Sequence, residues 1–292
     1  MKGKKYMIKV GIADISLDNW HTNHYPSYIR EAVKRANADM VLSYAFAKKD
    51  YDDEFRISNR EWCIENNVTF VGSAEELIEK CDAFMVMCAD DCRPHEELAM
   101  PFLKSGKHVY CDKTFAPDVE SAGRMFETAK KFNTPVFSCS AQRFCKDLLP
   151  YYGGIIKADF AASVGPGDLI NYSVHQFEMI EAAMGVGVKN CTAYTDGEIR
   201  HIVYEYEDER LSTFTQAPGL PFHFAAGSKC SGIANIEVGG YYEPFMDALV
   251  EFFTKGTLPV KEEDTMEIML MQQMARAAVK EPGKKISAKD VT

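Results

Sequence analysis

The stretch Lys104-Ser-Gly-Lys-His-Val-Tyr-Cys-Asp-Lys-Thr-Phe-Ala116 decides the fold that we expect for this chain of 292 residues. Gly106 favours the end of a helix, and the apolar run from His108 to Cys111 is typical of a short buried strand. Lys113, beside Asp112, then stands at the carboxyl end of that strand. Open parallel α/β sheets bind ligands outside the carboxyl ends of their strands. The stretch therefore predicts a functional lysine at the edge of a parallel sheet.

Strand-like and helix-like segments alternate on both sides of this stretch. We expect strands at 6–13, 40–46, 68–71, 83–88, 108–111 and 135–139, with helices between them at 26–37, 55–66, 74–80, 94–104 and 117–132. Such alternation is typical of parallel βαβ units. Six strands complete a doubly wound sheet, so residues 1–142 are expected to form a Rossmann-like dinucleotide-binding domain.

The pattern changes after residue 142. We expect a strand at 155–161, a helix from about 169 to 184, strands at 191–194, 199–206, 210–216 and 232–238, and helices at about 243–255 and 264–280. Consecutive strands with polar turns favour an antiparallel sheet. The fold class is therefore α/β, with residues 143–292 as a C-terminal α+β domain for substrate binding and oligomerisation. We expect a homodimer or homotetramer, because another subunit usually covers the exposed face of such a sheet.

The net charge and the lengths of the apolar runs argue against some classes of binding partner. The formal net charge of −10 argues against nucleic acid or an anionic membrane as the main partner. No apolar run approaches the roughly 18 residues that span a bilayer, and the start lacks a signal-peptide cleavage site, so we expect a cytoplasmic protein.

The nine cysteines follow no disulfide framework and are interpreted as free thiols. Zinc at Cys88, Cys92 and His95 is the alternative, but a second ligand pair is missing and no metal is predicted.

Four segments carry a family resemblance. They are Met85-Val-Met-Cys-Ala-Asp-Asp-Cys-Arg-Pro-His95, Gly106-Lys-His-Val-Tyr-Cys-Asp-Lys-Thr114, Ser140-Ala-Gln-Arg-Phe144 and, more weakly, Asn171-Tyr-Ser-Val-His175. Together they resemble the glucose-fructose oxidoreductase, inositol dehydrogenase and MocA (Gfo/Idh/MocA) family. In that family the second segment usually reads Gly-Lys-His-Val-x-x-Glu-Lys-Pro and the fourth often reads Asp-x-Gly-x-His. The resemblance is good from about residue 60 to 145 and partial from 165 to 185.

The resemblance implies an NAD(P)-dependent oxidoreductase that moves a hydride between nicotinamide and a carbohydrate-like substrate: a sugar, polyol or similar hydroxy or keto compound. Lys113 would polarise the reacting oxygen, and His175 would exchange the hydroxyl proton. The family's Asp is Asn171 here, which cannot stabilise an imidazolium by charge. On a helix, Asn171, His175 and Glu178 would share one face. The residues expected to bind substrate are Arg143, Tyr172 and Glu178, with a structural ion pair as the alternative for Arg143.

Residues after several strands are expected to contact the cofactor, NAD or NADP. They are Ala13, Ile15, Ser16, Trp20, His21, Lys48, Cys88, Asp90, His95 and Asp112. Lys48 and Lys49 stand where an acidic residue usually holds the adenosine ribose, so they either accept the 2′-phosphate of NADP or belong to a solvated turn. His21 and His24 have the spacing of half a metal site on a helix, but no carboxylate partner is evident.

The first loop departs from the dinucleotide fingerprint G-x-G-x-x-G. Ala13, Ile15 and Asp18 take the three glycine places, and Gly11 lies within the strand. A carboxylate about 4 Å from a phosphate charge costs roughly 1–4 kcal/mol in wet surroundings, and a helix N-terminus returns about 0.3–1 kcal/mol. A dinucleotide therefore requires Asp14 and Asp18 to point elsewhere, which Asp18 achieves if it caps the helix. The alternative function is a cofactor-free relative that acts as a sugar-binding sensor or regulatory protein; a non-redox lyase or isomerase is a third possibility.

Overall fold

The computed structural model describes residues 6–49, 57–88, 91–151, 158–228 and 232–291. The chain divides into two compact units. The first contains Met1–Ala116, Gly123–Ser138 and Phe245–Val260, and the second contains Pro117–Ala122, Cys139–Pro244 and Lys261–Thr292. The chain thus passes between the units several times, whereas the sequence suggested a single boundary at residue 142.

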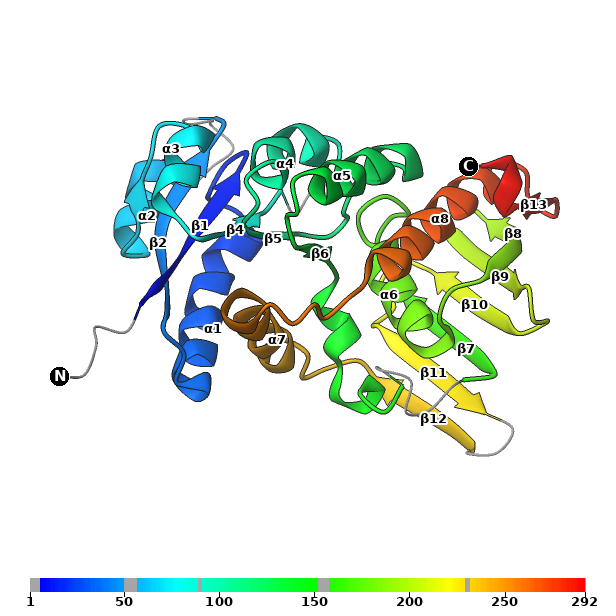
Figure 1. Cartoon of the computed structure of the whole chain (residues 1–292). Coiled ribbons are helices and arrows are strands. Elements are labelled where there is room, and N and C mark those ends of the chain that lie inside the picture. The colour runs from blue at the N-terminus through cyan, green and yellow to red at the C-terminus, as the bar shows by residue number, and fades with distance from the viewer. Residues whose placement is uncertain (1–5, 50–56, 89–90, 152–157, 229–231, 292) are drawn as a thin grey trace. The chain divides into compact units, whose positions relative to one another are not determined.

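The first unit is built on a six-stranded parallel sheet of order β3-β2-β1-β4-β5-β6 (Figure 1). Its strands are β1 (Ile8–Asp14), β2 (Met40–Ala47), β3 (Thr69–Phe70), β4 (Ala83–Val86), β5 (His108–Cys111) and β6 (Val136–Ser138). The helices along the first part of the chain are α1 (Trp20–Ala36), α2 (Asn59–Glu65), α3 (Ala74–Lys80), α4 (His95–Leu103) and α5 (Val119–Lys131). This is the doubly wound arrangement that the alternating pattern predicted, and its order reverses between β1 and β4.

Gly11 serves the packing of this sheet. A Cβ at this position would lie 2.9 Å from Leu77 Cδ1 and 3.0 Å from Cys81 Sγ. The glycine therefore lets α3 approach β1 closely. Gly11 has no part in a phosphate loop, as its place within the strand suggested.

Helix α1 begins six residues before the expected start at Pro26. The Asn19 side chain accepts the Thr22 N–H at 3.2 Å, and the Asn19 N–H contacts Thr22 Oγ1 at 3.4 Å, which completes a capping box. Pro26 lies inside the helix, although proline favours the first helical turn. The expected cap, Asp18, is not the cap: its carboxylate accepts from Asn23 Nδ2 at 2.8 Å.

Helix α7 (Tyr242–Lys255) returns to the first unit late in the chain. Its Phe245 ring lies 5.7 Å from Tyr110, and its Phe252 ring lies 4.8 Å from Phe137. Both partners sit on neighbouring strands of the parallel sheet. Aromatic packing therefore holds a distant segment on this sheet, which local sequence patterns cannot show.

The second unit contains a seven-stranded sheet of order β12-β11-β7-β10-β9-β8-β13. Its strands are β7 (Phe160–Gly165), β8 (Val188–Asp196), β9 (Ile199–Tyr206), β10 (Leu211–Gln216), β11 (His223–Ser228), β12 (Gly232–Glu237) and β13 (Lys285–Ser287). Neighbouring strands are antiparallel except β7 and β10, which are parallel. The sheet is mixed and mostly antiparallel, as expected. The expected strand at 155–161 begins at 160 instead; residues 155–157 lie outside the described part of the chain.

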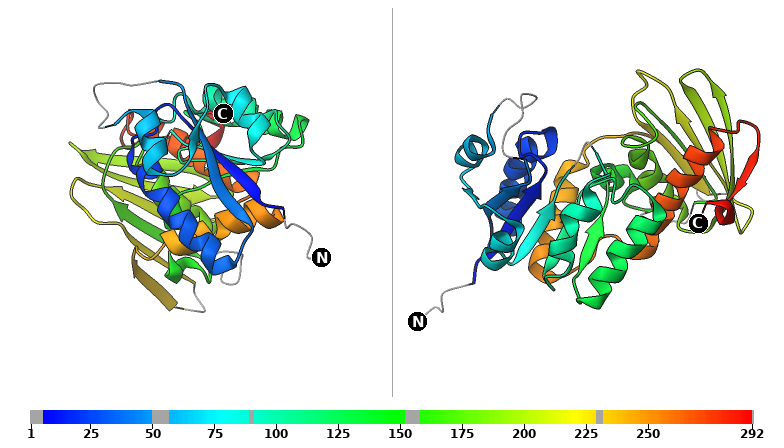
Figure 2. Two further views of the ribbon diagram at one scale, coloured as in Figure 1. Left: turned by 90° about the vertical axis from the view of Figure 1, so that its left-hand side faces the viewer. Right: turned by 90° about the horizontal axis from the view of Figure 1, so that it is seen from above.

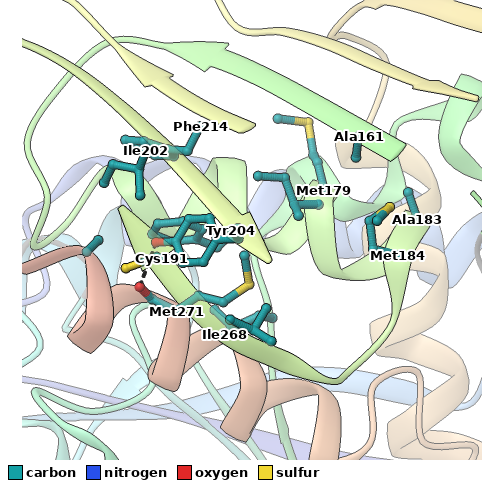
Figure 3. Packing of buried hydrophobic residues seen from close by; sticks show 14 of the residues in the cluster. Ala161, Met179, Ala183, Met184, Cys191, Ile202, Tyr204, Phe214, Ile268 and Met271 are labelled. Atoms are coloured by element: carbon teal, nitrogen blue, oxygen red, sulfur yellow. Dashed lines mark hydrogen bonds between the residues drawn. The ribbon is translucent and has the colours of Figure 1, made fainter. Parts of the chain in front are cut away.

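Helices α6 (Ser173–Met184) and α8 (Glu262–Ala278) pack on the second sheet, as the view from above shows (Figure 2). Three short 3₁₀ turns complete the unit: η1 (Ala141–Phe144), η2 (Lys146–Leu148) and η3 (Ala288–Asp290). Figure 3 shows the apolar core between these layers, where Tyr204 donates its hydroxyl hydrogen to the Met271 carbonyl at 2.8 Å. The methionines of α8 thus serve packing. None of the described helices has the length and apolar character needed to cross a membrane.

Candidate functional site

Lys113 follows β5 at the carboxyl edge of the parallel sheet, where the sequence placed it. Its backbone N–H donates to Asp112 Oδ1 at 2.9 Å, and the Tyr110 hydroxyl donates to the same oxygen at 2.7 Å. The second oxygen of Asp112 contacts His21 Nδ1. Burial raises the pKa of Asp112, but His21, Lys113 and Tyr110 together lower it more, to about 2. Asp112 therefore stays ionised and fixes the backbone that carries Lys113.

His95 holds the other side of this segment. Its ring is fully buried; Nδ1 lies 2.6 Å from the Thr114 carbonyl oxygen, and Nε2 contacts the Met87 carbonyl. Burial lowers the pKa of His95. The ring ties the end of β4 to the residue after Lys113. This position gives His95 a structural role in place of the expected cofactor contact.

The carboxyl group of Asp14, at the end of β1, faces the protein interior. One oxygen accepts the Ile15 N–H at 2.6 Å, and the other accepts from Asn19 Nδ2 at 2.8 Å. The side chain is 2% exposed, and burial raises its pKa to about 7 despite these hydrogen bonds. Asp18 is also buried, and its second oxygen lies 3.3 Å from the Ile57 N–H. Both carboxyl groups are therefore buried in hydrogen bonds within the protein, as a dinucleotide at this loop would require.

The remaining residues of the first loop differ in their exposure. Ala13 and Ser16 are buried, Ile15 is half-buried, and Trp20 is exposed. The His21 side chain is 12% exposed, and its ring stacks on Tyr25 with centroids 4.8 Å apart. The expected contacts from Ala13 and Ser16 side chains are therefore not supported, whereas Ile15, Trp20 and His21 remain accessible.

His24 and Lys48 are engaged by neighbouring residues. The His24 ring stacks on Trp20 with centroids 4.3 Å apart, and its Nδ1 lies 2.6 Å from the Trp20 carbonyl oxygen. Lys48 forms a surface ion pair with Glu97. Within the described ranges, no three His, Cys, Asp or Glu side chains are grouped as metal ligands. The ion pair favours a solvated turn at Lys48 over a dedicated phosphate contact.

Cys88 ends the segment after β4 with an unusual backbone. Its φ of 84° lies in the left-handed region that disfavours residues other than glycine. The thiol donates to the Asp91 carbonyl at 3.0 Å, and burial raises its pKa well above the ordinary value. Cys88 is therefore neutral and shapes the loop. Asp90, expected beside it, lies outside the described residues.

His175 lies on α6 in the second unit, among aromatic rings and a serine. The Tyr172 ring is 5.7 Å from the His175 ring and the Phe222 ring is 5.5 Å from it, both edge-on. Ser140 Oγ lies 2.6 Å from His175 Nδ1. Gly167, with φ of 86°, makes room for Tyr172, because a Cβ there would lie 2.3 Å from Tyr172 Cβ. This unit therefore holds a histidine in a defined orientation.

Asn171 does not share a helical face with His175. Helix α6 begins at Ser173, and Asn171 lies in the preceding turn, where its backbone N–H donates to Asp168 Oδ1 at 2.8 Å. The expected pairing of Asn171 with His175 assumed a helix from residue 169. The predicted pairing does not form, because the Asp168 side chain accepts the backbone N–H of Asn171 in a turn. The helix therefore does not extend back to Asn171.

Arg143 and Glu178 form an internal ion pair. Arg143 Nη1 lies 3.1 Å from Glu178 Oε2 and 2.5 Å from Glu181 Oε2, and all three side chains are at most 5% exposed. Burial raises the pKa of Glu178 to about 7, although Arg143 and the Ser140 N–H oppose this shift. The geometry favours the structural alternative for Arg143, and it gives Glu178 a supporting role in place of substrate binding.

Two neighbours of His175 in the fold, Ser140 and Phe222, could not be assigned a role from the sequence. Ser140 was part of a quoted segment but was assigned no role, and its position as the cap of a 3₁₀ turn is not visible in the sequence. Phe222 follows Leu220-Pro221 in a loop without any signal of function. Both reach His175 only through the fold of the second unit.

Comparisons with known proteins agree with this architecture. Residues 51–138 match an oxidoreductase family with an NAD-binding Rossmann fold. Myo-inositol 2-dehydrogenase of Thermotoga maritima is 25% identical over 143 residues, a match covering 42% of this chain and 42% of that enzyme. The chain thus aligns with less than half of that enzyme's length.

Two solved structures share the fold across the whole chain. Apo scyllo-inositol dehydrogenase from Lactobacillus casei matches at a TM-score of 0.76 and 12% identity, covering 97% of this chain and 98% of that one. GenD2 from gentamicin A biosynthesis, in complex with NAD, matches at a TM-score of 0.74 and 10% identity, covering 98% of each chain. At these identities the likeness shows the fold alone.

The parallel sheet and the matched segment define the first unit as a Rossmann-like domain. Residues 51–138 match the Gfo/Idh/MocA oxidoreductase family, in agreement with the resemblance seen in the sequence. The matched segment begins after the first loop, so the atypical phosphate loop lies outside it.

The family's cofactor can be tested against this loop. The described part of the loop, up to Trp20, contains no glycine that would let the backbone approach a pyrophosphate closely. The two carboxyl groups are turned inward, however, and Ile15, Trp20 and His21 remain accessible. The residues present therefore fit a dinucleotide that is held by side chains and the start of α1 in place of glycine N–H groups.

Proposed function

We propose that this chain transfers a hydride between NAD or NADP and a small sugar, polyol or similar hydroxy or keto compound. Bound nicotinamide would supply or accept the hydride. The relatives named inositol dehydrogenases make cyclic polyols the first compounds to test. Ile15, Trp20 and His21 would hold the dinucleotide in the first unit.

In this proposal Lys113 binds the reacting oxygen of the substrate. An ammonium group directed at that oxygen stabilises the negative charge that develops on it during hydride transfer. The support is the position of Lys113 at the carboxyl end of β5, one strand beyond the point between β1 and β4 where the strand order reverses. The side chain is only 6% exposed, which strengthens its electrostatic effect.

His175 takes the hydroxyl proton of an alcohol as its hydride leaves, or returns a proton to a ketone. Imidazole suits this task because its ordinary pKa is near neutral pH. Tyr172 and Phe222 flank the ring, and Ser140 contacts Nδ1. These contacts support a fixed orientation of the ring.

The observation that carries the proposal is Lys113, fixed by Asp112 and His95 at the ligand-binding edge of the sheet. We expect Lys113→Ala to leave the fold intact and to lower turnover of the best polyol by about 100-fold or more, the scale of removing one electrostatic donor. Lys104→Ala, on an exposed lysine close by in the sequence, is the matched control. Steady-state assays with circular dichroism measure both; unchanged turnover in the Lys113 variant would refute its role.

A cofactor-free sugar-binding protein is the second candidate. The specific support is the first loop, in which Ala13, Ile15 and Asp18 replace glycines and Asp14 is buried beside Asp112. Isothermal titration with cyclic polyols, in protein freed of nucleotide, separates the two candidates. Polyol binding without any affinity for NADH or NADPH supports the sensor; binding of a dinucleotide supports the oxidoreductase.

A further inference from the structure

Ser140 contacts α6 at two points. Its Oγ lies 2.6 Å from His175 Nδ1, and its backbone N–H donates to Glu178 Oε1 at 2.9 Å. His175 and Glu178 are three residues apart and therefore lie on one face of the helix. Arg143 holds the second oxygen of Glu178 at 3.1 Å. The buried ion pair thus fixes the serine that faces the histidine.

The hydroxyl hydrogen of Ser140 can be assigned an acceptor. Ser140 is fully buried, and its Oγ accepts the Gln142 N–H at 3.2 Å as the cap of η1. A hydroxyl has one hydrogen to donate, and a buried donor without a partner is unfavourable. Among the contacts of Oγ within the described residues, His175 Nδ1 is the one that can accept this hydrogen.

We propose that Ser140 is a positioning residue that sets the tautomer of neutral His175, with the ring hydrogen on Nε2. The proposal rests on the proposed function only for the catalytic meaning of His175. With the serine hydrogen on Nδ1, the ring meets a ligand oxygen at Nε2 as a hydrogen-bond donor. This arrangement suits the carbonyl form of the substrate.

Alcohol oxidation then requires a rearrangement. To take a hydroxyl proton at Nε2, the ring must first carry its hydrogen on Nδ1, and Ser140 must turn to accept it. The serine would then accept from both Gln142 and His175, and its own hydrogen would lose its acceptor. A carboxylate partner would favour the charged ring, whereas the serine favours the neutral ring. Asn171, at the family's Asp position, supplies no charge either.

Nitrogen NMR tests the tautomer without any activity. The protein is labelled with ¹⁵N-histidine, long-range ¹H–¹⁵N correlations are recorded above pH 8, and His175 is assigned with His175→Asn. We expect an unprotonated Nδ1 that accepts a hydrogen bond and a protonated Nε2. A His175 ring with its hydrogen on Nδ1 would overturn the proposal.

Variants separate positioning from general stability. Ser140→Ala should change the Nδ1 shift and populate the second tautomer, whereas Ser140→Thr, which keeps the hydroxyl, should retain the wild-type spectrum. Ser212→Ala removes another fully buried hydroxyl of the second unit and should leave His175 unchanged. An unchanged His175 spectrum in Ser140→Ala would refute the positioning role of Ser140. If this variant does not fold, the tautomer measured in the wild-type protein still tests the proposal.

Kinetics give a second readout. Ser140→Ala should lower kcat for ketone reduction by roughly 3- to 10-fold, the effect of losing one hydrogen bond of ordinary strength, and should move the pH profile. KM should change little, because the serine does not touch substrate. The expected tautomer in a protein without dehydrogenase activity would reject the proposed function and leave the role of Ser140 intact.

Discussion

Asp14 and Glu178 are buried carboxyl groups whose pKa values burial raises to about 7. An unfolded chain releases these protons near pH 4, so the folded protein holds more protons between pH 4 and 7. The stability that each group contributes is full below pH 4 and is lost as the pH rises through 7. Asp112 acts in the opposite direction, since its pKa is lowered to about 2 and its contribution is lost as the pH falls from about 4.

Replacement of Asp14 by asparagine tests this linkage. The amide resembles the protonated acid, so Asp14→Asn should be more stable than the wild type at pH 8, by at most about 4 kcal/mol, and by no more than about 1.5 kcal/mol at pH 5. Urea unfolding at both pH values measures the difference. Equal stabilities at pH 8 would mean that Asp14 is ionised without cost, and the inward orientation of its carboxyl group would be wrong.

Among the helices and strands, the six parallel strands could be predicted because each is a short apolar run and the first five are each followed by a helix. The start of α1 could not, because Pro26 resembled a first-turn proline while the true signal was the weaker pair Asn19 and Thr22. The start of α6 was also predicted wrongly. The amphipathic pattern continues into residues 169–172, but backbone N–H groups there donate to the Asp168 side chain and form a turn. In both helices, side-chain hydrogen bonds to the backbone determine where the helix starts.

Strands β11 and β13 were also missed. His223–Ser228 is rich in small residues and Lys285–Ser287 is only three residues long, so neither shows an alternating pattern of useful length. Both form because neighbouring strands supply partners from distant parts of the chain. The candidate residues Lys113 and His175 could be located from motifs, whereas Ser140 and Phe222 required the fold, since their contacts join residues 35 or more positions apart.

At the scale of the molecule, the second sheet leaves apolar side chains uncovered on one face. Phe160 and Leu211 are paired in register on β7 and β10 and are 36% and 49% exposed. Their neighbours along each strand alternate with buried residues that face the core. This face supports the proposal that the chain forms a homodimer or homotetramer, because burying such side chains stabilises association.

Light scattering after size exclusion tests the assembly. We expect a mass of two or four chains for the wild type and a larger monomer fraction for Leu211→Glu, because a buried charge opposes association. Glu209→Ala, at an exposed turn before β10, is the control and should behave as the wild type. A clean monomer for the wild type at micromolar concentration would contradict the proposal.

We propose that the atypical first loop still admits a dinucleotide, because Asp14 and Asp18 are turned into the protein's own hydrogen bonds. Fluorescence titration of the folded protein with NADH and then NADPH measures this binding. We expect saturable binding in the micromolar range to at least one of them. No binding to either, with circular dichroism showing a folded protein, would contradict it.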